Sequence, residues 1–174
     1  MPTPHSTASV TTSEPVHRTV ESGADGGQRH GRRGPLVLSA ALLAVAALLM
    51  TGCIGLNENQ DKNLRWVNQS RAQYGRSALP IYADAQAKAQ AWADRLAREN
   101  RLYHSTLSAG ITTRWCGLAE NVGEGSYTSQ VHEAFMRSPQ HRANILDRAW
   151  TGMGVGVARR GNTAWVVHVF VQAC

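Results

Sequence analysis

The sequence contains only three cysteines, and no two of them form a C-x-x-C pair. That scarcity argues against a zinc ribbon and a thioredoxin-like redox site, because both need closely spaced cysteines. The globular part also lacks any run of basic residues interleaved with aromatics, although 18 Lys and Arg against 12 Asp and Glu give a net charge of +6. The sequence therefore predicts a solvated basic surface and no nucleic-acid partner.

Common catalytic signatures are missing as well. No G-x-S-x-G occurs, so a serine-hydrolase elbow has no support. His132-Glu133 begins like the zinc-protease pattern H-E-x-x-H, but residue 136 is Met and the pattern fails. The glycines over 152–156 lie in a strand-like stretch with no helix after it, which excludes a dinucleotide-binding loop. No nucleophile can be assigned, and we assign no catalytic residue.

The first 53 residues differ in composition from the rest of the chain. Residues 1–34 are rich in Ser, Thr, Gly, Pro and His without apolar periodicity, which predicts disorder. Residues 35–53 contain an apolar run over 36–50, preceded by Arg32 and Arg33. The run has the length of a signal-peptide core and is short for a membrane span. We therefore expect 35–53 to be a signal peptide or a membrane anchor.

The apolar run ends in Leu49-Met50-Thr51-Gly52-Cys53, which resembles the lipobox of bacterial lipoproteins. In that interpretation Cys53 carries the lipid and becomes the first residue of the mature protein. An uncleaved signal anchor and ordinary cleavage are the alternatives. All three place the rest of the chain outside the cytoplasm, and the first two hold it at the membrane, so we expect an extracellular or cell-surface bacterial protein.

The two other cysteines are Cys116 and Cys174. If Cys53 carries lipid, they remain as an even pair in an oxidising compartment. The economical prediction is a Cys116–Cys174 disulfide, and two unpaired buried thiols are the alternative.

The remainder of the chain divides into a linker over 54–61 and one domain over 62–174. Asp61 and Asp84 are expected to cap the first two helices, and the stretch from His104 to Tyr127 lacks strong periodicity. Hydrophobic spacing predicts helices over 62–74, 85–102 and 128–137, and a short helix that restarts at Ser138-Pro139. Alternation over 154–157 and 165–171 predicts a terminal hairpin. Helices followed by a hairpin indicate an α+β sandwich.

Four segments, in this order, resemble the CAP superfamily, which includes plant pathogenesis-related proteins, venom allergens, cysteine-rich secretory proteins and bacterial SCP-like proteins. They are LRWVNQSRAQYG over 64–75, the stretch 87–105 ending in LYHS, AENVG over 119–123, and SPQHRANIL over 138–146 with GMGVG over 152–156. The S-P-x-H-R-x-N-I-L form is most similar to the bacterial branch.

The resemblance implies an α+β fold, a three-layer α-β-α sandwich with a central antiparallel sheet. It also implies a cleft where His104, Glu120 and His141 converge. Ser138 occupies the position where animal and plant members often carry a second Glu, so a three-residue site is expected. Two imidazoles and a carboxylate suit Zn²⁺ or another divalent ion. A hydrogen-bonded network that only shapes the cleft is the alternative.

Three functions follow from the resemblance. The first is an envelope-tethered binding module, acting as a monomer, whose ligand is a lipid, a wall component or a protein. The second is a divalent-metal-dependent, peptidase-like hydrolase that uses His104, Glu120 and His141. The third is an interaction domain without a small ligand.

Overall fold

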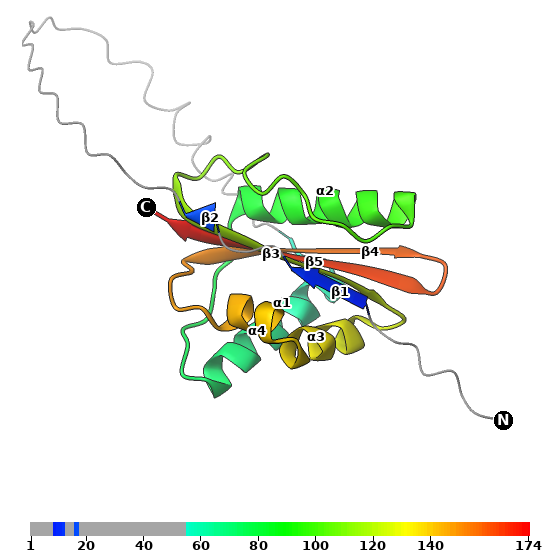
Figure 1. Cartoon of the computed structure of the whole chain (residues 1–174), viewed down its shortest axis with the longest axis horizontal. Coiled ribbons are helices and arrows are strands. Elements are labelled where there is room, and N and C mark those ends of the chain that lie inside the picture. The colour runs from blue at the N-terminus through cyan, green and yellow to red at the C-terminus, as the bar shows by residue number, and fades with distance from the viewer. Residues whose placement is uncertain (1–8, 13–15, 18–54) are drawn as a thin grey trace, which may run out of the picture. The chain divides into compact units, whose positions relative to one another are not determined.

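A computed structural model describes residues 9–12, 16–17 and 55–174 of the chain. An antiparallel sheet lies between helices on both of its faces (Figure 1). Helix α2 (Ala83–Glu99) covers one face. The other face is covered by α1 (Glu58–Gln73), α3 (Thr128–Arg137) and α4 (Pro139–Leu146). The predicted α+β fold, a three-layer α-β-α sandwich, is confirmed.

The sheet has the strand order β1-β3-β5-β4, and β2 also pairs with β3. The long strands are β3 (Trp115–Gly125), β4 (Gly152–Arg160) and β5 (Thr163–Ala173). Strands β4 and β5 form the predicted hairpin, in which Arg160 pairs with Thr163. Gly161 has a φ of +56°, a conformation that glycine adopts without strain, and it makes the tight turn possible.

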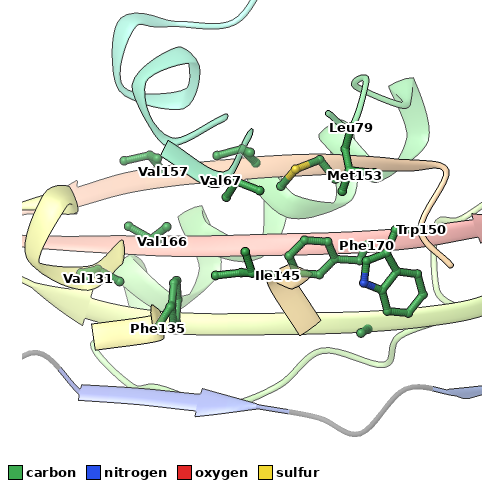
Figure 2. Packing of buried hydrophobic residues seen from close by; sticks show 12 residues of the cluster. Val67, Leu79, Val131, Phe135, Ile145, Trp150, Met153, Val157, Val166 and Phe170 are labelled. Atoms are coloured by element: carbon green, nitrogen blue, oxygen red, sulfur yellow. The ribbon is translucent and has the colours of Figure 1, made fainter. Parts of the chain in front are cut away.

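Each face of the sheet has its own hydrophobic cluster. On the α2 face, alanines of the helix lie against valines of β5. On the other face, each of the three helices contributes an apolar side chain to one cluster with Phe170 of β5: Val67, Phe135 and Ile145 (Figure 2). The sheet is therefore covered on both faces, as strands rich in valine require.

Strand β3 was not predicted, because the stretch over 104–127 shows no strong periodicity. The strand is central and nearly all of its residues are buried, so polar and apolar residues do not alternate along it. Its sequence also contains glycines and the polar pair Glu120-Asn121, which weaken the appearance of a strand.

The first two helices begin earlier than expected. Helix α1 starts at Glu58, because Asn57 and Gln60 form a capping box in which each side chain accepts from the other's backbone N–H. The predicted linker over 54–61 is therefore too long. Helix α2 starts at Ala83 after Tyr82, and Asp84 lies inside its first turn. Helix α4 begins as predicted, with Pro139 in its first turn.

Two short strands lie in the segment 1–34, for which we expected disorder. They are β1 (Ser9–Thr12) and β2 (Val16–His17), and both pair with β3. For these six residues the prediction was wrong, since a Ser-Val-Thr-Thr sequence is suited to an extended backbone beside an available sheet edge. The rest of 1–34 and all of 35–53 lie outside the described residues. Among the helices that the structure describes, none has the length and apolar character needed to cross a bilayer.

Candidate functional site

Glu120 is a charged side chain in the middle of the central strand β3, and it is fully buried. It shares a strand face with Leu118 and Val122, which pack in the α2 cluster. Its carboxylate accepts hydrogen bonds from the backbone N–H of Ser105 (2.9 Å), the Ser105 hydroxyl (2.7 Å) and His104 Nδ1 (2.8 Å). These bonds replace the water that a buried carboxylate loses, so the charge can be accommodated inside the sandwich.

The chain reaches Glu120 by turning back after α2. Asn100 ends that helix in a left-handed conformation, with a φ of 51° and a ψ of 45°. The loop after Asn100 then brings His104 and Ser105 to the carboxylate. Because a carboxylate only accepts, His104 Nδ1 carries the proton of this hydrogen bond. His104 Nε2 is buried and has no hydrogen-bond partner within the described part of the chain.

A cavity of about 730 Å³ lies between α2 and the loop that follows it. Its α2 side is formed by Ala87, Lys88, Ala91, Trp92, Arg95 and Arg98. His104 and Ser105 line the loop side. The hydrogen-bonded group around Glu120 therefore holds part of the cavity wall in place.

The cavity carries an excess of positive charge. Lys88 Nζ donates to the carbonyl oxygens of Thr106 (2.7 Å) and Ala109 (2.9 Å). Burial lowers the pKa of Lys88, and the nearby Glu120 carboxylate opposes that shift. Two further cations lie along the same helix. Arg95 pairs with Glu99 at 2.8 Å, whereas Arg98 has no acidic partner among the described ion pairs.

Asp84 anchors this loop, although the sequence predicted a different role for it. Asp84, expected to cap α2, instead accepts the backbone N–H groups of Thr112 (2.8 Å) and Thr113 (2.6 Å) through Oδ2. Burial by itself would raise the pKa of Asp84, but hydrogen bonds from Thr113, Thr112 and Ala85 lower it overall. The far end of the cavity loop is thus tied to the first turn of α2.

Sequence reasoning did not identify the cavity-lining residues of α2. A stripe was visible in the sequence, because Lys88, Trp92 and Arg95 follow the i, i+4, i+7 spacing of one helix face. Such a stripe is typical of any solvated helix. Only the loop that folds over it makes it the wall of a cavity.

His141 lies on α4, on the opposite side of the sheet from Glu120. Its ring centroid is 5.2 Å from that of Phe135, and its Nδ1 is 2.7 Å from the hydroxyl of Ser138. Neighbouring residues of a strand point to opposite faces, so Glu120 faces α2 while Asn121 faces α4. The structure brings His104 to Glu120 and Ser138 to His141, but it does not unite the two pairs.

The predicted zinc ligands His104, Glu120 and His141 therefore do not fit a common metal ion. Across 55–174 and the two short N-terminal strands, no group of three His, Cys, Asp or Glu side chains could hold one. The sheet lies between His141 and the pair of His104 and Glu120, so the three residues do not form one group. We derive no reaction step through a metal.

The predicted disulfide between Cys116 and Cys174 is confirmed. It joins the start of β3 to the residue after β5, across a sequence separation of 58 residues. Cys53, the predicted lipid attachment site, lies outside the described residues.

The sequence model of the family described as CAP, the cysteine-rich secretory protein family, matches residues 64–173. The chain belongs to this family. Among curated proteins, no sequence matches it.

Solved structures similar to this CAP chain come from several organisms. An outer surface protein of Borrelia burgdorferi has a TM-score of 0.60 at 17% identity, over 70% of this chain and 97% of that one. Venom allergen-like protein 4 of Schistosoma mansoni has a TM-score of 0.57 at 12% identity, over 68% and 91%. An extracellular SCP-domain protein of Bacillus anthracis has a TM-score of 0.57 at 20% identity, over 66% of this chain and only 40% of that one. At these identities the likeness shows the fold.

Two asparagines join the CAP segments 119–123 and 138–146. Asn121 Nδ2 donates to the His141 carbonyl (3.1 Å), and Asn144 Nδ2 donates to Asn121 Oδ1 (2.9 Å). Trp150 Nε1 in turn donates to the Asn144 carbonyl (2.7 Å). These residues hold α4 against β3, so their role in this CAP domain is structural.

Proposed function

We propose that this CAP domain is an extracellular binding module, and that its ligand binds in the cavity between α2 and the following loop. The observation that carries the proposal is the lining of that cavity, where three cations lie beside apolar surface. Its volume of about 730 Å³ falls in the range of small-ligand sites, about 300–1,000 Å³.

The ligand class that fits this lining is an acidic lipid. Arg98 presents a planar guanidinium whose paired N–H groups match a phosphate, and Lys88 adds a second positive charge. Ala87, Ala91 and the ring of Trp92 offer apolar surface to an acyl chain. A phosphate-containing wall polymer shares the headgroup chemistry but lacks the acyl chain.

The His104–Glu120–Ser105 group has a positioning role in this proposal. Its hydrogen bonds fix the loop side of the cavity. No observation favours the hydrolase, since the residues expected to act together lie on two faces of the sheet. Lipidation of Cys53, which remains a prediction, would keep the cavity close to membrane lipid.

Binding can be measured by calorimetry on the full chain with soluble short-chain lipids. The probes are dihexanoyl phosphatidylglycerol, which is anionic, dihexanoyl phosphatidylcholine, which is zwitterionic, and a glycerol phosphate oligomer without acyl chains. We expect the phosphatidylglycerol to bind and the other two to bind at least about tenfold more weakly, since phosphatidylcholine lacks the net negative charge and the oligomer lacks the acyl chain.

Arg98→Gln should weaken phosphatidylglycerol binding at least about tenfold through the loss of a charge-assisted contact. Arg137→Gln is the matched control, because it removes the same charge from α3 on the other face of the sheet. Equal binding of the two short-chain lipids, or equal effects of the two variants, would contradict the proposal. Stronger binding of the glycerol phosphate oligomer would identify a wall polymer as the ligand instead.

A further inference from the structure

The two edges of the sheet are covered in different ways. At the β4 edge, the Gln86 amide donates to the Val155 carbonyl (2.8 Å) and accepts from the Val155 N–H (2.9 Å). Gln90 does the same for Val157, at 3.1 and 3.0 Å. Side chains of α2 thus take the place of a neighbouring strand, and this edge is closed by the domain itself.

The opposite edge belongs to β3 and is covered only by β1 and β2 among the described elements. Ser9 to Thr12 pair antiparallel with Glu124 to Asn121. Val16 and His17 pair with Leu118 and Gly117. In Figure 1 the two short strands follow β3 from one end toward the other.

The covalent connection between these two strands and the rest of the domain runs through residues 18–55. Both strands precede in the sequence the apolar run that we expect to be an export signal. Cleavage at the lipobox-like ending before Cys53 would therefore separate β1 and β2 from α1 to β5. No helix or strand of residues 56–174 would then pair with the outer edge of β3.

We infer that the outer edge of β3 is a strand-binding site for an extended polypeptide segment of a partner protein. The strands β1 and β2 fill this site in the full chain. The occupant observed here indicates the chemistry, because Ser-Val-Thr-Thr is uncharged and contains three β-branched residues. Main-chain hydrogen bonds supply most of the affinity in this mode of recognition, so related sequences can replace one another.

The site is distinct from the proposed lipid cavity. The cavity lies over α2, whereas β1 pairs with β3 along the sheet edge. A partner segment would add to the sheet as β1 does, and one face of the added strand would look toward α3 and α4, which lie beside β1.

The test uses the full chain with the edge opened by substitution. Alternate residues of an antiparallel strand donate to a given neighbour, so Val10→Pro combined with Thr11→Pro removes a donor whichever of the two faces β3. Thr7→Pro is the control, since it lies outside the paired residues. Hydrogen exchange is measured at residues 117–124 of β3 and, as a check on folding, at β5.

We expect the amides of 117–124 that point toward β1 and β2 to lose protection in the double variant, while those that point toward β5, and β5 itself, stay protected. A synthetic peptide of residues 5–19 should then bind the double variant and restore the protection, and it should not bind the unaltered chain. The same peptide with Thr11→Pro and Val10→Pro should bind at least about tenfold more weakly, about 1.4 kcal/mol.

Three results would overturn the inference. One is full protection of 117–124 in the double variant, which would mean that β1 does not cover the edge. Another is an opened edge to which neither peptide binds. The third is concentration-dependent dimerisation that protects 117–124, which would make a second copy of this chain the occupant.

Discussion

Gly154 of β4 lies so close to α2 that a Cβ atom on it would be 2.1 Å from the carbonyl oxygen of Ala85. Two residues further along, a Cβ on Gly156 would be 2.0 Å from the carbonyl oxygen of Ala89. The G-x-G-x-G pattern therefore marks a close approach of strand and helix backbones. This approach also brings the amides of Gln86 and Gln90 within reach of the β4 edge.

We expect Gly154→Ala to destabilise the fold by about 3 kcal/mol or more. The added methyl group would overlap the backbone of Ala85, which cannot shift without moving the rest of α2. Chemical denaturation of both proteins measures the change in the free energy of unfolding. Gly55→Ala is the matched control, since nothing lies within 4 Å of a Cβ there and no positive φ is involved. A Gly154→Ala protein as stable as the control would contradict the close approach.

The disulfide predicts a second stability change. Cys116 and Cys174 close a loop with a sequence separation of 58 residues, for which loss of the bond costs about 2–4 kcal/mol. Reduction and the Cys174→Ser substitution should therefore lower the free energy of unfolding by similar amounts. Once Cys174 is replaced, a reductant should have no further effect. A continued response to reductant in that variant would show that another bond is being broken.

A third change in stability is expected at Arg71, because its side chain connects α1 to the end of α4. Its Nη1 donates to the carbonyl oxygens of Ile145 (2.7 Å) and Asp147 (2.8 Å), and its Nε donates to that of Ser77 (2.8 Å). The side chain is almost fully buried. Arg71→Leu should cost about 3 kcal/mol or more in unfolding free energy, since it leaves these buried carbonyls without donors.

Arg65→Leu on the same helix is the control for that measurement. Arg65 is exposed and pairs with Asp61 at the surface, so its loss should change stability by about 1 kcal/mol at most. Similar losses in the two variants would mean that the carbonyl bonds of Arg71 contribute little.

The parts of the fold that could be predicted are those whose structure is determined by a short stretch of the sequence. The α4 start at Ser138-Pro139 and the terminal hairpin come from short stretches with strong conformational preferences, and both were predicted. Strand β3 was missed because its residues are buried on both faces and their order carries no alternation. The early start of α1 depends on a capping box of Asn57 and Gln60, whereas we expected the cap at Asp61.

The candidate site was likewise predicted only in part. The pairing of His104 with Glu120 was anticipated through the family motifs, and the two side chains do meet. His141 lies on the other face of the sheet, and the order of motifs along the chain does not tell which face each one occupies. The cations of the α2 cavity were missed because their importance depends on a loop folded over them.

Two buried histidines predict loss of stability in acid. His168 is fully buried on β5, and neither ring nitrogen has a hydrogen-bond partner within the described residues. Burial lowers the pKa of His168 from 6.5 to about 3, helped by the nearby His132 and His141. Burial likewise lowers the pKa of His132 to about 4. Both rings are therefore neutral in the folded protein at pH values where unfolded histidine is protonated.

It follows that the unfolded chain binds more protons than the folded chain between about pH 6.5 and pH 4. The free energy of unfolding should fall as the pH is lowered through that range, by about 1.4 kcal/mol per pH unit for each histidine. Above pH 7 both states hold neutral rings, so neither histidine contributes a slope. Denaturation curves measured from pH 4 to pH 8 give the dependence directly.

His168→Leu keeps a buried side chain of similar volume and removes one of the two groups. We expect its unfolding free energy to fall less steeply below pH 6.5 than that of the unaltered protein, by about 1.4 kcal/mol per pH unit, with parallel curves above pH 7. An unchanged acid slope would mean that His168 takes up its proton without unfolding the domain. That outcome would require the packing around Phe135, whose ring centroid lies 5.1 Å from that of His168, to open to water in the folded state.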